Sequence, residues 1–173
     1  MATKTKIKDS IKNLFIKELT DKKEVERLER VKTNANLREA TIYTSKDQPQ
    51  SKQFIDFLTN EGIKFIEKEQ SEYVNEYNEF VATTNMGGFP SVIINNNFLV
   101  MRRDFQTPQQ LVGAIQFLGN PGFKNTNSEK TVLEHLKTTN YNLLMRLNQL
   151  SQQITPIITF VKNIEKQLKE EDT

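Results

Sequence analysis

Apolar residues recur every seven positions through the last quarter of this 173-residue chain, in two sets spaced three residues apart. The first set is Leu133, Asn140, Leu147, Ile154, Val161 and Leu168. The second set is Leu136, Leu143, Leu150, Ile157 and Ile164. This spacing is the a and d pattern of a coiled coil, in which each apolar side chain packs against another helix. We therefore expect a long helix over residues 129–173, with these eleven residues (the seam) as an oligomerisation surface.

Several residues within this segment modify the simple pattern. Asn140 occupies an a position, where a buried Asn costs stability but fixes register and strand number. Pro156 lies at c, lacks a backbone donor and clashes with the preceding turn, so a kink or break near Pro156 is predicted. Leu144, Ile158 and Phe160 are apolar at e and g, which widens the buried face. A helical hairpin that folds back is the alternative, but it would need a turn at residue 155 with almost no loop residues.

Apolar residues also recur at helical spacing near the start of the chain. They are Ile7, Ile11, Leu14, Phe15, Val25, Leu28 and Val31. Asp21 is followed three residues later by Glu24, the pattern of a capping box, so two helices with a break near residue 20 are allowed. Residues 1–38 are therefore predicted to form a helical arm, which either docks on the main domain or binds another protein.

Residues 39–119 alternate between strand and helix patterns, and a polar linker, 120–128, separates them from the C-terminal helix. Strands are expected at 41–44, 63–67, 91–94 and 98–101. Helices are expected between residue 51 and Gly62, over 71–84 with Tyr73 or Val74, Tyr77 and Val81 inward, and from Thr107 to Gly119. Asn95-Asn96-Asn97 is expected to form a tight hairpin turn, because Asn tolerates positive φ. The order β-α-β-α-β-β-α predicts an α/β domain with one four-stranded mixed sheet and flanking helices.

Two motifs in this domain carry a resemblance to a known family. Gln48-Pro49-Gln50-Ser51 follows a strand that ends in Tyr-Thr, and Phe89-Pro90 immediately precedes the third strand. In these respects residues 39–119 resemble the glutaredoxin branch of the thioredoxin fold, which has Cys-Pro-x-Cys at the first place and a cis proline at the second. The resemblance implies a thioredoxin-like sheet and a ligand groove beside the cis proline.

The redox chemistry of that family needs residues that this chain lacks. The chain contains no cysteine, so it has no thiolate nucleophile and no disulfide. Gln48 cannot ionise, and the hydroxyl of Ser51 stays protonated without a base. The single histidine, His135, is expected on the surface of the C-terminal helix. Val100-Met101 stands where the family has a Gly-Gly pair that lets glutathione approach the backbone, so glutathione binding is expected to be weak.

Charge and composition exclude further classes of function. The chain has 24 Lys and Arg against 22 Asp and Glu, a net charge of +2, so neither nucleic acid nor a membrane is expected as a partner. Arg102-Arg103 near Lys46 is interpreted as a solvated face. No stretch reads as a secretory signal or a membrane span, so a cytoplasmic location, or one inside a virion assembled in a cell, is expected. No metal or cofactor is predicted, because the sequence has no His and carboxylate ligand spacing and no Gly-rich phosphate loop.

Together these patterns predict a non-enzymatic structural or assembly protein, a homo-oligomer or a subunit of a larger assembly. Its glutaredoxin-like domain would serve as a scaffold between two helical extensions. The Asn-rich, Cys-free composition suits a component of a virus or bacteriophage particle. The alternative is an adaptor that binds a peptide or a glutathione-like ligand along the strand edge at Phe89 and Pro90. A third hypothesis, an enzyme that uses Ser51 or an outside cysteine, is disfavoured.

Overall fold

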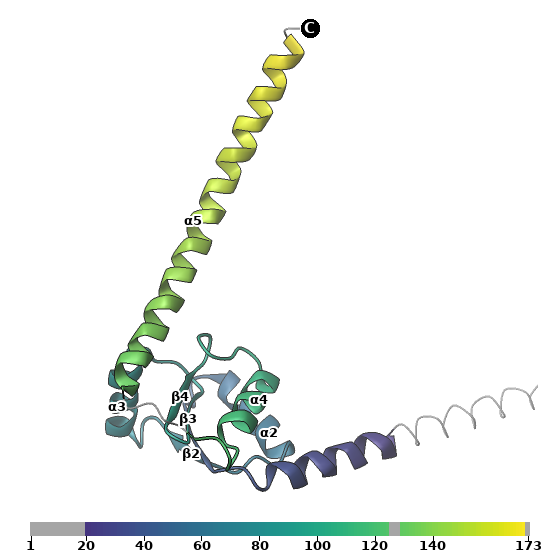
Figure 1. Ribbon diagram of the computed structural model, residues 1–173, viewed down its shortest axis with the longest axis vertical. Coiled ribbons are helices and arrows are strands. Elements are labelled where there is room, and N and C mark those ends of the chain that lie inside the picture. The colour runs from purple at the N-terminus through teal and green to yellow at the C-terminus, as the bar shows by residue number, and fades with distance from the viewer. Residues whose placement is uncertain (1–19, 125–128, 172–173) are drawn as a thin grey trace, which may run out of the picture.

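The computed structural model describes residues 20–124 and 129–171, with side chains described as far as residue 167 (Figure 1). A helix over residues 20–34 comes first. The following elements are β1 Ala40–Thr44, α2 Pro49–Asn60, β2 Phe65–Glu69, α3 Val74–Thr84, β3 Ser91–Ile94, β4 Asn97–Val100, α4 Pro108–Leu118 and α5 Lys130–Glu171. The predicted order of strands and helices is therefore confirmed. Residues 39–119 are called the body below.

The four strands form one mixed sheet in the order β2-β1-β3-β4. β1 pairs parallel with β2, and β1–β3 and β3–β4 are antiparallel. The β3–β4 hairpin turns through Asn95 and Asn96, which both have positive φ (47° and 61°) as a two-residue type I′ turn requires. The prediction of an α/β domain with a four-stranded mixed sheet is thus confirmed.

Successive residues of a strand point to opposite faces of a sheet, and here each face has its own core. Ile42 of β1 belongs to the larger core, beneath α2 and α4, together with Leu58 and Ile115. Tyr43, the next residue, lies in the smaller core beneath α3, against Phe80. α2 and α4 therefore cover one face of the sheet, and α3 covers the other, where the base of α5 joins it (Figure 1).

Several predicted element boundaries differ from the structure, among them the starts of β2 and α3. β2 begins at Phe65 rather than residue 63, because Gly62 (φ 69°) turns the chain at the end of α2 and places Ile63 in the core. α3 begins at Val74 rather than residue 71. Tyr73 and Val74 are 37% and 44% exposed, so neither points inward as predicted.

The C-terminal helix α5 is a single helix of 42 residues that continues through Pro156 (Figure 1). Of the two outcomes predicted at Pro156, a kink or a break, the break is therefore wrong, and with it the hairpin alternative. Proline removes one backbone hydrogen bond and its ring crowds the preceding turn, and here the side chains around it are exposed. On both sides of the proline, threonine hydroxyls donate to carbonyls one turn earlier: Thr155 to Ser151 at 2.8 Å and Thr159 to Thr155 at 3.0 Å.

The helix over residues 20–34 is anchored to the body by its last turn. Asn34 is fully buried, donates to the carbonyl oxygen of Glu61 (2.7 Å) and accepts from Gln116 (2.9 Å). Earlier in this helix, Val25 and Leu28 are 56% and 49% exposed. The structure thus places the end of the predicted arm against the body, whereas the break proposed near residue 20 and the residues before it lie outside the described part.

Candidate functional site

The motif Gln48-Pro49-Gln50-Ser51 lies at the N-terminus of α2. Gln48 is the N-cap residue, in extended conformation and without a side-chain capping bond, and Pro49 takes the first helical position. Proline suits that position because the amide that it lacks would have no partner there. The motif therefore lies after β1, at the start of a helix.

The peptide bond between Phe89 and Pro90 is cis, as the resemblance implied. The ring of Phe89 stacks on Tyr77, with 4.7 Å between ring centroids, and the Tyr77 hydroxyl accepts from the backbone nitrogen of Gly88 (2.9 Å). Pro90 itself is fully buried, and Ser91 behind it donates to the Gly88 carbonyl. These contacts from α3 hold the loop in front of β3.

The structure brings the two motifs together across a small hollow of about 150 Å³, the cis-Pro groove. Its lining residues are Gln48, Gln50, Met86, Gly87, Gly88, Phe89, Met101 and Arg102. Of the pair expected to obstruct a ligand, only Met101 lines the groove, because Val100 is fully buried. Arg102 has a left-handed φ of 73°, which turns the chain at the groove. Glycine adopts this conformation most easily, and an arginine here adds a charged side chain instead.

Ser51 lies on the other side of the first turn of α2, at a cavity of about 870 Å³. The residue is 4% exposed, and its hydroxyl has no hydrogen-bond partner within residues 20–124 and 129–171. A serine nucleophile needs a neighbouring base to accept its proton. His135 lies on α5, where its ring nitrogen contacts the carbonyl of Ala82 (3.1 Å).

Charged residues of both signs line the same cavity. Lys46 lies 3.8 Å from Glu72, and Thr44 donates to Glu67 (2.8 Å). The hydroxyl of Ser71 donates to Glu69 and lowers the pKa of that carboxyl below its usual value. Within the described part of the chain, no group of three or more His, Asp or Glu is placed to hold a metal ion. In the same residues, no helix is long and apolar enough to cross a membrane.

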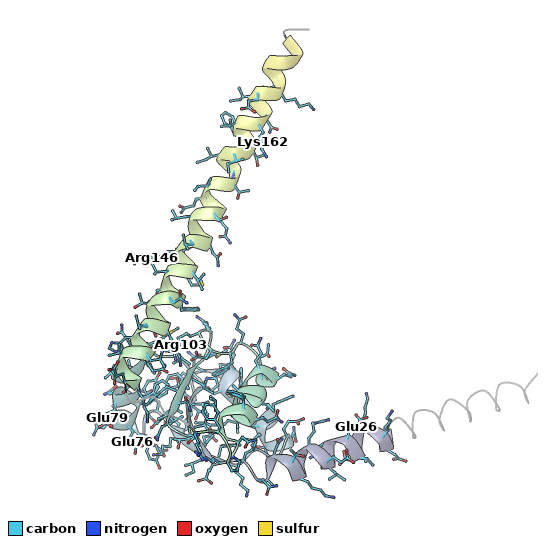
Figure 2. All side chains as sticks on the ribbon, viewed as in Figure 1. Glu26, Glu76, Glu79, Arg103, Arg146 and Lys162 are labelled. Carbon is cyan, nitrogen blue, oxygen red and sulfur yellow. The ribbon has the colours of Figure 1, made fainter. Side chains whose placement is uncertain are left out.

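The interpretation of Arg102 and Arg103 as a solvated face is wrong for Arg103, whereas Arg102 is exposed. Its side chain is 2% exposed, at the base of α5 (Figure 2). It forms ion pairs with Asp104 (2.7 Å) and with Glu134 of α5 (2.5 Å), and it donates to the Thr138 hydroxyl (3.0 Å). Thr138 in turn donates to the Thr84 carbonyl at the end of α3 (2.7 Å). Arg103 therefore fastens α5 to the body. We call Arg103, Glu134 and Thr138, with the contacts between them, the latch.

Most of the seam lies on the other side of α5 from the latch, whereas Asn140 and the neighbouring Leu144 line a shallow hollow together with Arg103 and Asp104. Its nine apolar members from Leu133 to Ile164 are between 38% and 62% exposed, and Asn140 is exposed as well. Leu144, Ile158 and Phe160 extend this apolar surface, with exposures of 53%, 49% and 64%. The side chain of Leu168, the last seam residue, lies outside the described part. Figure 2 shows the side chains of α5 projecting freely beyond the body.

Comparison with protein-family models, with curated proteins and with solved structures finds no match to this chain.

Proposed function

We propose that this chain is a non-catalytic assembly protein, in which a glutaredoxin-like body of the thioredoxin fold serves as a scaffold and the helices join copies of the chain. The observation that carries the proposal is the seam. Exposed apolar patches of this size on a protein surface mark interaction sites. The absence of cysteine and the many asparagines suit a component of a virus or bacteriophage particle, formed in the cytoplasm of the host.

The sheet order and the hairpin support the glutaredoxin-like assignment of the body. In the order β2-β1-β3-β4, the parallel pair β2-β1 is followed by the antiparallel hairpin β3-β4. The helix that carries the Gln48 motif, α2, follows β1 directly in the chain. The Gln48 motif and the Phe89 loop then face one groove, as the resemblance expects of a redox site and its cis-proline loop.

The residues at the redox position support a non-catalytic role. Thiol chemistry needs a thiolate at the N-terminus of α2, where the helix dipole would stabilise it. Gln48 holds that place and does not ionise. The buried Ser51 has no side chain positioned to accept its proton within the described residues.

The assembly function is tested by sedimentation of the full chain. We expect the wild-type protein to self-associate, and the double variant Leu150→Asp, Ile157→Asp to be monomeric, because two charges would be buried at d positions. Gln149→Asp, at an exposed c position of the same helix, is the matched control and should associate as the wild type does. A monomeric wild-type chain, or unchanged association of the double variant, would contradict the proposal. Turnover of glutathione-linked disulfides by the purified protein would contradict its non-catalytic part.

A second candidate function is an adaptor that holds a peptide or a glutathione-like ligand in the cis-Pro groove. The observation that favours it is the convergence of Gln50, Phe89 and Arg102 on one hollow, where the cationic side chain of Arg102 lies beside the loop before β3. Titration of the protein with glutathione, followed by amide chemical shifts, tests this candidate. Saturable shifts confined to residues near Phe89 and Arg102 would support the adaptor, and an absence of shifts would rule it out for this ligand.

A further inference from the structure

The way that α5 docks on the body leaves the seam free for another chain. In the heptad numbering, Glu134 is at b and Thr138 is at f, and both are buried against the body at 3% and 2% exposure. Position f lies about 170° around the helix from the midline between a and d, because successive residues turn by about 100°. The body therefore occupies the outer side of α5. From residue 142 to residue 167, every side chain is exposed.

The apolar surface on offer is large enough for a stable interface. Twelve large apolar residues, the nine exposed seam members with Leu144, Ile158 and Phe160, are about half exposed. Aromatic side chains bury 150–250 Å² and Leu, Ile and Val somewhat less, so we take about 80 Å² for the exposed half of a typical member, or roughly 950 Å² per chain. Counting the nine seam members alone, two facing helices would bury roughly 1,400 Å², within the 1,200–2,000 Å² range of specific interfaces.

Asn140 indicates that the occupant is the same helix in parallel and in register. It is the single polar residue among the described seam positions. A buried amide is costly unless another polar group meets it. In a parallel arrangement without stagger, the Asn140 side chains of all chains share one layer and pair with one another. In an antiparallel arrangement, Asn140 would face an apolar layer of its partner.

The C-terminal half of the seam favours three strands over two. Ile154, Ile157, Val161 and Ile164 place β-branched residues at both a and d, which shifts coiled coils from dimers toward higher strand numbers. Ile158 at e and Phe160 at g would stay at the rim of a two-stranded coil. A bundle of three buries a wider stripe on each helix and covers them.

We propose that α5 forms a parallel, in-register coiled coil of three copies of this chain, with three bodies held outside its N-terminal end. This inference rests on the proposed assembly function and specifies the partner of the seam. Pro156 fits the arrangement, because position c faces outward and its ring and missing amide hydrogen stay away from the bundle. The latch turns each body away from the bundle axis.

The strand number is tested by the mass of the full-length protein, measured by sedimentation equilibrium and by native mass spectrometry. We expect three times the chain mass of 20.1 kDa. A mass of two or four chains would overturn the inference and leave the assembly function intact. A monomer at all concentrations would contradict both, so the two failures are distinguishable.

Orientation is tested with a single introduced thiol, since the wild-type chain has no cysteine. In Leu147→Cys, equivalent a positions of parallel chains face each other, close enough for a disulfide between Cα atoms 4.4–6.8 Å apart. Three chains allow one disulfide per trimer, so mild oxidation should convert about two thirds of the chains to disulfide-linked pairs. The reduced variant must first show the wild-type mass.

The matched control is Gln149→Cys, whose c position faces outward and should give little cross-linking. Nearly complete cross-linking of Leu147→Cys would indicate an even strand number and overturn the trimer. No cross-linking, in a variant of unchanged mass, would overturn the parallel, in-register arrangement.

Discussion

The latch between α5 and the body offers a sharp test of how the long helix is attached. Glu134→Gln keeps the shape of the side chain and removes the negative charge that faces Arg103. In the wild type this carboxylate is 4% exposed and also pairs with Lys137 (2.7 Å). The variant therefore replaces an ion pair by a hydrogen bond from the charged guanidinium to a neutral amide, at a site nearly inaccessible to water.

The magnitude follows from what remains around Arg103. Hydrogen bonds to charged groups contribute about 1.5–3 kcal/mol, and leaving a buried charge without any partner costs about 3–5 kcal/mol. Asp104 still lies 2.7 Å from the guanidinium, so Arg103 is not left unpaired. We therefore expect Glu134→Gln to lower the free energy of unfolding by about 2 kcal/mol, within the range for a hydrogen bond to a charged group. Arg103→Met, which leaves Glu134 with only the 39%-exposed Lys137, should cost about 3 kcal/mol or more.

Urea unfolding of the full chain, followed by circular dichroism, measures this loss. With a urea dependence of about 2 kcal/mol per molar, the midpoint should fall by about 1 M. All variants must be compared at one chain concentration, because association makes apparent stability concentration-dependent. Glu129→Gln, an exposed carboxylate just before α5, is the control. If Glu134→Gln and the control Glu129→Gln have the same urea midpoint, the latch does not hold α5 as we argue.

Three further predictions concern the body and are measured by the same urea unfolding. Gly62→Ala should cost about 1–3 kcal/mol, because φ is +69° and the added Cβ would lie 2.7 Å from Val31 Cγ1; an unchanged midpoint would contradict this. Thr107→Ala should cost about 1 kcal/mol by removing the acceptor for the Gln110 amide, and a loss below about 0.3 kcal/mol would count against it. Burial raises the pKa of the Tyr43 hydroxyl, so the folded state holds the hydroxyl proton more tightly than the unfolded state does. The resulting contribution to stability is fully present below about pH 10 and is lost as the pH rises through the folded pKa. Tyr43→Phe should therefore lose less stability than the wild type between pH 9 and pH 11, and equal losses would refute the argument.

Local signals in the sequence are sufficient for most of the body. The Asn95-Asn96 turn was predictable because two positive φ values in a row favour asparagine, and the start of α4 because Thr107 and Pro108 are a cap and a first helical residue. Each of these depends on residues that are neighbours in the chain. The same holds for Gly62 at the end of α2.

The features that the sequence did not reveal depend on distant partners. Arg102 and Arg103 are adjacent and chemically identical, yet one lines the groove and the other is buried. The difference arises from Glu134, 31 residues later, whose pairing with Arg103 no local pattern indicates. Likewise, Tyr73 stays outside because the Lys68 ammonium of β2 lies over its ring, 4.9 Å from the centroid. The heptad pattern located the seam, but only the fold tells which side of α5 the body takes.

The length of α5 beyond the body has a mechanical consequence. Some 30 residues, from 142 to the end of the helix at Glu171, follow Tyr141, the last half-buried residue among the described side chains of α5, and span about 45 Å at 1.5 Å per residue. A rod of this length works as a ruler, since whatever meets its far end is kept at a fixed distance from the sheet. It also works as a lever: a tilt of about 10° at the latch would move the tip by roughly 8 Å. Side chains of the latch, at the N-terminal end of α5, therefore determine the position of its C-terminal end relative to the sheet.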